Sequence, residues 1–355
     1  MKALGCLRVL ILGVWLAGVP LAQAVPPPPR GLYLLSDRHV PVEKMVLPSF
    51  LSGYALRIAW KDLEPTKGEY NFALIKSTVS ELQKRKLKLT LEIFASMVPD
   101  YVLAGAEGTF KVRGGMAPLP WDPQAQARWK ALLGALAQLQ VWDSVANKEV
   151  ALRDHPTLTA MDAPVVGLQC IRDIRRDLVS HPAYRRELFL DAVEASVRSS
   201  REAFPADYGF TGFFRMEDDN RRPSLDEAVF VRLERTFMGP DQAGLGLFQE
   251  LWSDDGPNKS TLGAFLARVK APNVVMLQSL TSWKRPFTSP ERVASGNPDK
   301  AFAAAYKEFG ARYFELYSAD VRSSDLKPVF EAWAARLNAG GELEKTSASR
   351  PMSSK

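Results

Sequence analysis

The sequence predicts an α/β protein built as a single (β/α)8 TIM barrel, and three observations lead to this. Short apolar runs rich in β-branched and aromatic residues alternate with segments of helical periodicity. There are eight such runs over about 300 residues, which is the strand count and size of this barrel. No run leads into a glycine-rich phosphate-binding loop, which would favour the competing open, doubly wound sheet.

The strands and helices follow from these patterns in order. Strands are predicted at 31–35, 55–60, 87–94, 165–171, 210–216, 245–251, 274–280 and 312–317. Helices are predicted at 73–86, 124–139, 185–204, 225–237, 261–270, 299–309 and 324–337. Ser224 and Glu227 precede an apolar periodic segment at capping-box spacing, which marks a helix start.

The chain divides into four predicted segments. Residues 1–24 have a basic start, an apolar run and a small-x-small ending at Ala22-Gln23-Ala24, which indicates a signal peptide. An uncleaved membrane anchor is the alternative, although the run is shorter than the ~20 residues a span needs. Residues 25–30 form a Pro-rich linker, 31–338 the barrel and 339–355 a disordered, Ser-rich tail. We therefore expect a secreted or periplasmic protein with no membrane span in the mature chain.

Composition limits the classes of partner. Apolar residues make up 46% and charged residues 24%, as in soluble globular proteins, and the net charge of +6 is spread without a Lys/Arg-rich run. No nucleic-acid partner is expected. Two cysteines and three scattered histidines give neither a disulfide framework nor a zinc pattern, so no metal and no cofactor are predicted. A single domain of this size is expected to be a monomer.

A motif follows the second predicted strand. Arg57, Trp60, Glu64-Pro65, Gly68, Tyr70 and Phe72 fit the element R-x-x-W-x-x-x-E-P-x-x-G-x-Y-x-(F/W). Here the sequence resembles the clan A glycoside hydrolases, in particular the β-galactosidase-like barrels. The likeness covers roughly residues 31–140, including the Pro-containing loops at 91–99 and 118–123, and beyond that is mainly the order of strands. It implies a carbohydrate ligand, an oligo- or polysaccharide, at the carboxyl ends of the barrel strands.

Arg57 has two compatible interpretations. The resemblance implies that it lies beneath the catalytic nucleophile. Strand alternation places it on one face with Ala55 and Ala59, whose small side chains leave room inside the barrel. An ion pair with Glu92 on the neighbouring strand is the structural interpretation, whereas Glu64-Pro65 and Gly68 are typical of turn architecture.

The sequence departs from the family where its chemistry resides. Clan A enzymes carry an Asn-Glu pair at the end of strand four and a Glu at the end of strand seven. The predicted fourth strand, 165–171, has no Asn-Glu, and Gln278 stands where the Glu of strand seven is expected. A glutamine cannot ionise, so it can be neither nucleophile nor general acid. Hydrolysis therefore has to use other carboxylates.

Glu250 on strand six and Glu315 on strand eight are the candidate acid/base and nucleophile. Their apolar neighbours are of the kind that raises a carboxyl pKa. The strands lie roughly 10 Å apart, and inward-leaning side chains would reach the about 5–5.5 Å of retaining or about 6.5–9.5 Å of inverting enzymes. Two alternatives stay open: Gln249 faces the axis instead of Glu250, or Glu315 is a buried carboxylate that ties the barrel closed.

Aromatic and polar residues at the strand ends are predicted to bind the ligand. A sugar ring stacks on an indole, whose N–H can bond a hydroxyl. Core packing is the alternative for each tryptophan. The candidate ligand-binding residues are Trp60, Trp252, Trp283, Gln278 and Glu217.

Together these features predict an exported, glycoside hydrolase-like barrel that binds, and if active hydrolyses, a glycan at its carboxyl-terminal rim. The alternative is a pseudoenzyme that serves as a carbohydrate-binding or cell-envelope scaffold protein. A different chemistry on the same barrel is a third interpretation, since fold does not fix function.

Overall fold

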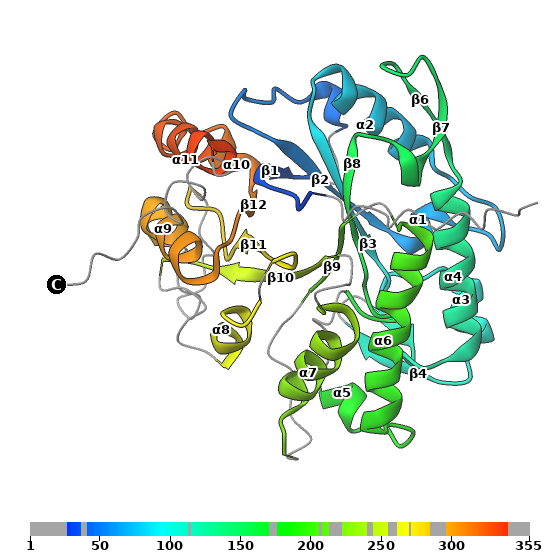
Figure 1. Cartoon of the computed structure of the whole chain (residues 1–355). Helices are drawn as coiled ribbons and strands as arrows, with labels where there is room; N and C mark the ends of the chain where they lie inside the picture. The colour runs from blue at the N-terminus through cyan, green and yellow to red at the C-terminus, as the bar shows by residue number, and fades with distance from the viewer. Residues whose placement is uncertain are drawn as a thin grey trace, which may run out of the picture.

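Eight parallel strands close into a barrel, as the sequence predicts. The structure, a computed structural model, describes residues 27–36, 41–112, 115–169, 176–205, 208–212, 222–239, 244–254, 261–269, 271–284 and 296–339. The strands pair in the order β1-β12-β11-β10-β9-β8-β3-β2, and β1 also pairs with β2 (Figure 1). Their bounds are β1 (Gly31–Leu35), β2 (Gly53–Ala59), β3 (Lys88–Phe94), β8 (Leu158–Asp162), β9 (Tyr208–Gly212), β10 (Leu245–Trp252), β11 (Val274–Ser279) and β12 (Tyr313–Leu316).

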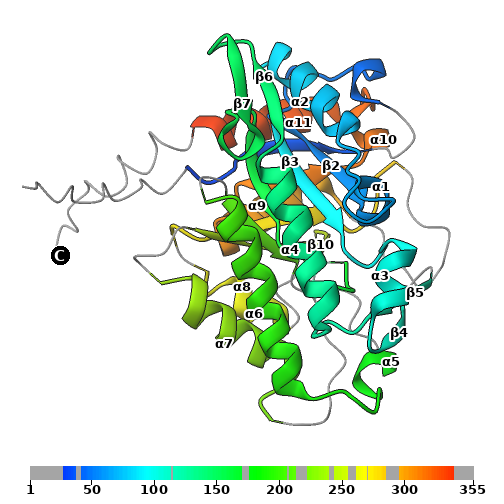
Figure 2. The same ribbon diagram turned by 90° about the vertical axis from the view of Figure 1, so that its right-hand side faces the viewer.

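Helices surround the barrel on its outside (Figures 1 and 2). The longer ones coincide with the predicted helices: α2 (Ala73–Lys84), α4 (Pro123–Ala137), α6 (Arg186–Ala203), α7 (Leu225–Phe237), α9 (Pro298–Phe309) and α11 (Lys327–Ala339). The shorter helices are α1 (Trp60–Leu63), α3 (Asp100–Gly105), α5 (Arg176–Val179), α8 (Thr261–Leu266), α10 (Ser318–Val321), η1 (Val42–Lys44) and η2 (Leu152–Asp154). The predicted cap is present, because Ser224 Oγ accepts a hydrogen bond of 3.4 Å from Glu227 N at the start of α7.

Two antiparallel hairpins interrupt the alternation. One consists of β4 (Thr109–Val112) and β5 (Gly115–Pro118), and it follows β3 at the carboxyl end of the barrel. The other consists of β6 (Gln140–Asp143) and β7 (Lys148–Ala151), and it precedes β8 at the amino end. Figure 2 shows β6 and β7 projecting away from the barrel. Neither hairpin was predicted from the sequence.

The fourth strand corrects one prediction. It is β8, whereas the predicted run at 165–171 begins with a turn in which Leu168 N donates to Val165 O at 2.8 Å. Gly167 has φ +79°, and a Cβ there would meet Pro118 O at 2.3 Å, so only glycine fits without strain. Val165, Val166 and Leu168 are buried, which explains their apolar character without a strand.

Side chains of the strands divide between two cores. Residues facing outward pack against the helices; Trp252, for example, lies 4.7 Å from Phe302 and 4.8 Å from Phe314 between ring centroids. A separate inner layer lies within the barrel and consists of Tyr33, Ala160, Phe248, Met276 and Tyr313. The inner layer closes the barrel, so polar groups above it have an apolar floor.

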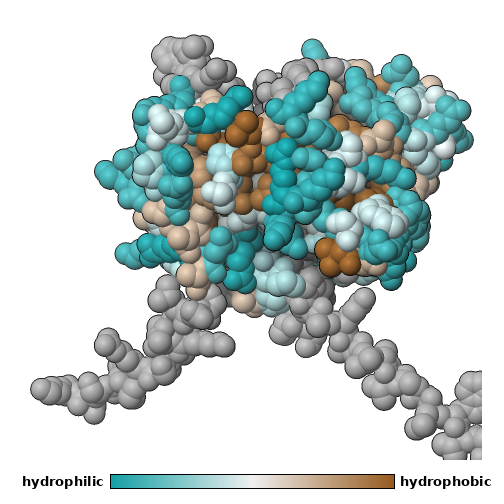
Figure 3. Space-filling model, turned by 90° about the horizontal axis from the view of Figure 1, so that it is seen from above, coloured by the Kyte–Doolittle hydropathy of each residue, from teal (hydrophilic) through white to brown (hydrophobic). Residues whose placement is uncertain are grey.

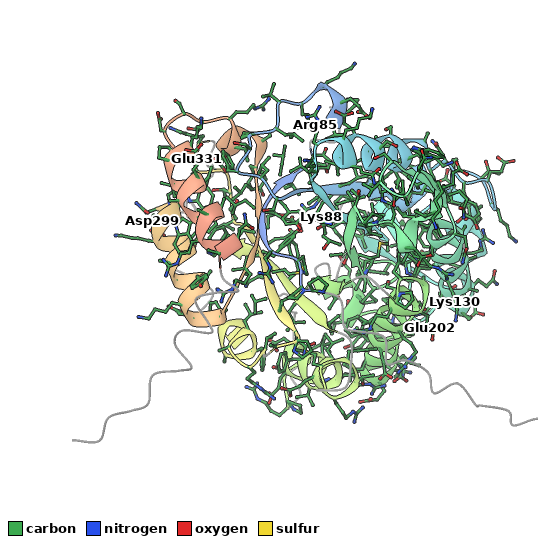
Figure 4. All side chains as sticks on the ribbon, turned by 45° about the horizontal axis from the view of Figure 1, so that its top comes forward. Arg85, Lys88, Lys130, Glu202, Asp299 and Glu331 are labelled. Atoms are coloured by element: carbon green, nitrogen blue, oxygen red, sulfur yellow. The ribbon has the colours of Figure 1, made fainter. Side chains whose placement is uncertain are left out.

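The outer surface is mainly polar. On the face seen in Figure 3, hydrophilic side chains predominate, with smaller hydrophobic areas between them. Ion pairs also join neighbouring helices on the outside of the barrel, such as Lys130 of α4 with Glu202 of α6 at 3.0 Å (Figure 4). No helix in the described part of the chain is long and apolar enough to cross a bilayer. The predicted signal peptide (1–24) lies outside the described residues, as does the tail beyond residue 339.

Candidate functional site

A ring of polar side chains lies inside the barrel toward the carboxyl ends of its strands. Glu250, Gln278 and Glu315 each stand two residues after an inner-layer residue, so strand alternation turns them inward as well. Arg57 and Glu92 are paired in register on β2 and β3, and their strand neighbours, such as Leu56 and Leu91, belong to the helix-facing core. We call Arg57, Glu92, Glu250, Gln278 and Glu315 the polar ring.

Arg57 is the centre of the polar ring. Its Nε donates to Glu92 Oε2 at 2.7 Å, which confirms the predicted ion pair. Its Nη2 donates to Glu315 Oε2 at 3.2 Å and to Gln278 Oε1, and lies 3.4 Å from Glu250 Oε1. One guanidinium therefore ties together side chains from β3, β10, β11 and β12.

The polar ring is buried almost throughout, and a small exposed fraction distinguishes Arg57 and Glu250. The side chains of Arg57 and Glu250 are 10% and 7% exposed, whereas those of Glu92 and Glu315 have no exposed surface. Glu250 reaches Arg57 inside the barrel, so it is Glu250 that faces the axis, and Gln249 lies on the other face of β10. The alternative that the sequence left open at these two positions is thereby decided.

Glu315 takes the buried role. Burial raises the pKa of Glu315 well above its ordinary value, and the charge of Glu92 adds to this, while Arg57 and a 2.6 Å hydrogen bond from Tyr313 Oη act in the opposite direction. A carboxyl group with no exposed surface cannot contact a ligand. Glu315 therefore anchors Arg57 and Tyr313, and its predicted role as nucleophile does not fit this burial.

The distance between Glu250 and Glu315, taken alone, would have allowed them to act as a catalytic pair. Glu250 Oε1 and Glu315 Oε2 lie 3.4 Å and 3.2 Å from the same Arg57 nitrogen. Their separation is therefore at most about 6.6 Å, the two distances end to end, which includes the about 5–5.5 Å of a retaining pair. This upper limit is compatible with a catalytic pair, but the full burial of Glu315 is not.

Gln278 has a fixed orientation in the polar ring. Its Oε1 accepts from Arg57, so its amide nitrogen points away and donates to Tyr317 Oη at 2.9 Å. Tyr317 follows β12, is half-buried, and was missed by the sequence analysis. The alternation of Tyr313, Glu315 and Tyr317 could have revealed it, because these three share one face of a strand.

The fourth strand is β8 and not the predicted run at 165–171, so Asp162 is the last residue of this strand. It stands two residues after Ala160 of the inner layer and is 1% exposed. β8 ends with Met161-Asp162, where clan A enzymes carry Asn-Glu. The Asn-Glu pair is therefore still missing, although a carboxylate is present. Placing the strand at 165–171 hid this residue.

Two of the predicted sugar-binding tryptophans belong to the core. Trp60 has no exposed surface, lies 5.1 Å from Trp129 between ring centroids, and donates to Glu64 Oε2 at 3.2 Å. Trp252 has none either, and its Nε1 donates to Ala301 O at 3.0 Å. Neither indole has a face for a sugar, so both predictions are wrong. Trp283 is half-buried and packs edge-on against Trp252 at 5.5 Å.

Glu64 and Gly68 explain much of the motif around Arg57. Glu64 has no exposed surface, accepts from Gly68 N at 2.9 Å and pairs with Arg128 of α4. Gly68 has φ +80°, a conformation that favours glycine. These residues hold the segment after β2 against α4, in agreement with their interpretation as turn architecture.

Other candidates lie outside the described residues. Glu217 is one of them, together with Asp173, Asp218 and Asp219. Among the residues that are described, no group of three or more His, Cys, Asp or Glu side chains is arranged to hold a metal ion.

Comparisons with known proteins give the fold. No family model and no curated protein matches the sequence. A β-galactosidase from the psychrophilic Marinomonas ef1 has TM-score 0.55 and 10% identity over 89% of this chain and 60% of its own. A cold-adapted β-galactosidase from Rahnella sp. R3 has TM-score 0.53 and 12% identity over 81% of this chain and 51% of its own. The chain thus spans 60% and 51% of these two proteins, and it shares the (β/α)8 fold of the clan A glycoside hydrolases that its motif predicts.

Proposed function

We propose that the chain binds a glycan at the carboxyl ends of its barrel strands, above the polar ring. One observation carries this proposal: Arg57 and Glu250 are the charged members of the polar ring that keep exposed surface. They lie at the end of the barrel where such folds carry their sites. A carboxylate and a guanidinium are also suitable hydrogen-bond partners for sugar hydroxyls.

Hydrolysis and binding without hydrolysis require different side chains at the site. Hydrolysis usually needs two carboxyl groups that both reach the glycosidic bond. The polar ring offers Glu250, because Gln278 cannot ionise and Glu315 is fully buried. This favours a glycan-binding barrel; a hydrolase would need a second carboxylate from the rim, for which Glu217 is our candidate. Trp283 remains a proposed ligand contact, whereas Gln278 is only 2% exposed and its amide is bonded to Arg57 and Tyr317, so we propose that it positions Arg57.

The test measures binding and turnover together. Purified protein is screened on a glycan array and for release of reducing sugar, and Glu250→Gln is compared with the unmutated chain. A glycan-binding barrel gives binding without turnover, weakened by the substitution. A hydrolase gives turnover that falls by orders of magnitude in Glu250→Gln while affinity is kept. The absence of binding and turnover on every glycan would refute the proposal.

We also propose that the protein is exported and monomeric. The charged start, apolar run and Ala22-Gln23-Ala24 support export. N-terminal sequencing of the mature protein should begin at Val25, and an intact Met1 in the cytosolic fraction would contradict this. Light scattering should give the mass of one chain.

A further inference from the structure

The turn between β6 and β7 is fixed by hydrogen bonds. Asp143 Oδ1 accepts from Val145 N at 2.8 Å and from Ala146 N at 3.2 Å, so this carboxylate closes the turn. Gln83 of α2 bonds to the same turn, because its Nε2 donates to Asp143 Oδ1 at 2.7 Å and its Oε1 accepts from Ser144 N at 3.0 Å. The projecting hairpin (Figure 2) is therefore held in one conformation, so a ligand would meet a preformed surface.

The two faces of this hairpin differ in composition. Val141 lies on one face and is 2% exposed, within the hydrophobic core. Trp142 lies on the opposite face and is 49% exposed, although tryptophan is on average a highly buried residue. Glu149 is the register partner of Trp142, and Gln140 stands two residues before Trp142, so both share its face, and both are exposed. This Trp142 face, made of Gln140, Trp142 and Glu149, presents an indole beside a carboxylate and an amide.

These side chains suit a sugar ring. The C–H face of a pyranose stacks on an indole, and hydroxyls at the edge of the ring can donate hydrogen bonds to a carboxylate or an amide oxygen. A lipid surface rich in phosphate fits less well, because the carboxylate of Glu149 would meet like charge beside the indole. A stable protein partner would need an interface of about 1,000 Å² or more, whereas the Trp142 face has a single large apolar side chain.

We propose that the Trp142 face is a second glycan-binding site, on which Trp142 stacks against a pyranose ring and Glu149 and Gln140 accept hydrogen bonds from its hydroxyls. The site goes beyond the proposed function, since the hairpin lies at the amino end of the barrel and the polar ring lies toward the carboxyl end. A projecting pair of strands can lie against a long chain or an insoluble surface (Figure 2). The expected ligand is therefore a neutral polysaccharide whose rings expose flat C–H faces, as those of cellulose and chitin do.

The experiment measures co-sedimentation of the purified protein with microcrystalline cellulose and with chitin beads. The unmutated protein should bind at least one of the two polymers. Trp142→Ala should weaken this binding at least about tenfold, and Trp142→Tyr, which keeps an aromatic ring, should restore most of it. Glu149→Ala should weaken it less, because the stacking contact remains.

A matched control and a chemical measurement locate the contact. Val231→Ala removes an apolar side chain that is 45% exposed on α7, which lies away from β6 and β7 in both views (Figures 1 and 2), and should leave binding unchanged. N-bromosuccinimide oxidises exposed indoles, so Trp142 should react, whereas Trp60 and Trp252 have no exposed surface and should not. Cellohexaose or chitohexaose should protect Trp142, as read by mass spectrometry of its peptide. Thermal melting checks that each variant is folded.

Any one of three results overturns the inference: sedimentation with neither polymer, equal binding by the unmutated protein and Trp142→Ala, or no protection of Trp142 by either hexasaccharide. If Trp142→Ala does not fold, protection of Trp142 in the unmutated protein decides. These results leave the proposed function standing, because the glycan array with Glu250→Gln tests the polar ring at the other end of the barrel.

Discussion

Replacing Arg57 by Met should destabilise the barrel more than any surface arginine would. Arg57 is only 10% exposed, and its loss removes a 2.7 Å bond to Glu92 and a 3.2 Å bond to Glu315. A charge-assisted hydrogen bond contributes about 1.5–3 kcal/mol, and breaking a buried ion pair by removing one partner costs about 3–5 kcal/mol. We therefore expect the free energy of unfolding to fall by about 3–5 kcal/mol.

The assay is urea unfolding followed by tryptophan fluorescence, arranged as a double-mutant cycle with Glu92→Gln. Removing both partners should restore part of the loss, since Glu92 is no longer a stranded charge. Arg198→Met is the control: the Arg198 side chain on α6 is 53% exposed and pairs with Glu194 one turn away at 2.7 Å, so its loss should cost about 1 kcal/mol or less.

The pH dependence has a definite sign. Without Arg57, the stranded carboxyl groups favour protonation in the folded state, so their folded pKa values lie above the unfolded ones. The folded state then binds more protons, and the stability of Arg57→Met should recover as pH falls toward the ordinary carboxyl pKa of about 4.3. Equal losses for Arg57→Met and Arg198→Met, together with zero coupling to Glu92, would refute the buried ion pair.

Substitutions at four other positions test the fold. Gly167→Ala should lower the free energy of unfolding by about 1–3 kcal/mol, because Gly167 has a positive φ and a Cβ there would lie close to Pro118 O. Gly134→Ala places a Cβ in open space on α4, so it should raise the free energy of unfolding by about 0.5–1 kcal/mol in the same urea assay. Trp252→Ala should cost about 3–5 kcal/mol, and a Trp252→Phe variant that keeps the fold should keep glycan affinity; a selective loss of affinity would return Trp252 to the site. Burial lowers the pKa of His155, so as the pH falls the unfolded chain binds a proton before the folded protein does. The free energy of unfolding should therefore decrease as the pH falls below about 6.5. In melting experiments at different pH values, His155→Gln should lose this pH dependence.

The hydrophobic pattern of the sequence was sufficient to predict most of the strands and helices. Apolar alternation and helical periodicity are local properties, and so β10 and α7 lie where they were predicted. The run at 165–171 misled because Val165, Val166 and Leu168 are buried in a turn and not in a strand; the glycine at position 167 was the available sign of that turn.

The motif around Arg57 likewise pointed to the right fold, and the pairing of Arg57 with Glu92 followed from two adjacent strands 35 residues apart in sequence. What the sequence did not determine was which carboxyl group meets solvent. Glu250 and Glu315 look alike in sequence, each flanked by apolar residues, and Trp60 and Trp252 look like rim residues.

Only the closed barrel gives these residues different exposure to solvent. Closure brings β12 against β1, so that Glu315, 258 residues from Arg57, becomes fully buried, while the Glu250 side chain keeps an exposed fraction of 7%. Alternation fixes the face of a strand on which a side chain lies, because it depends on neighbouring residues alone. Depth in the barrel and access to solvent depend on strand register and on the helices outside, which are contacts between distant parts of the chain.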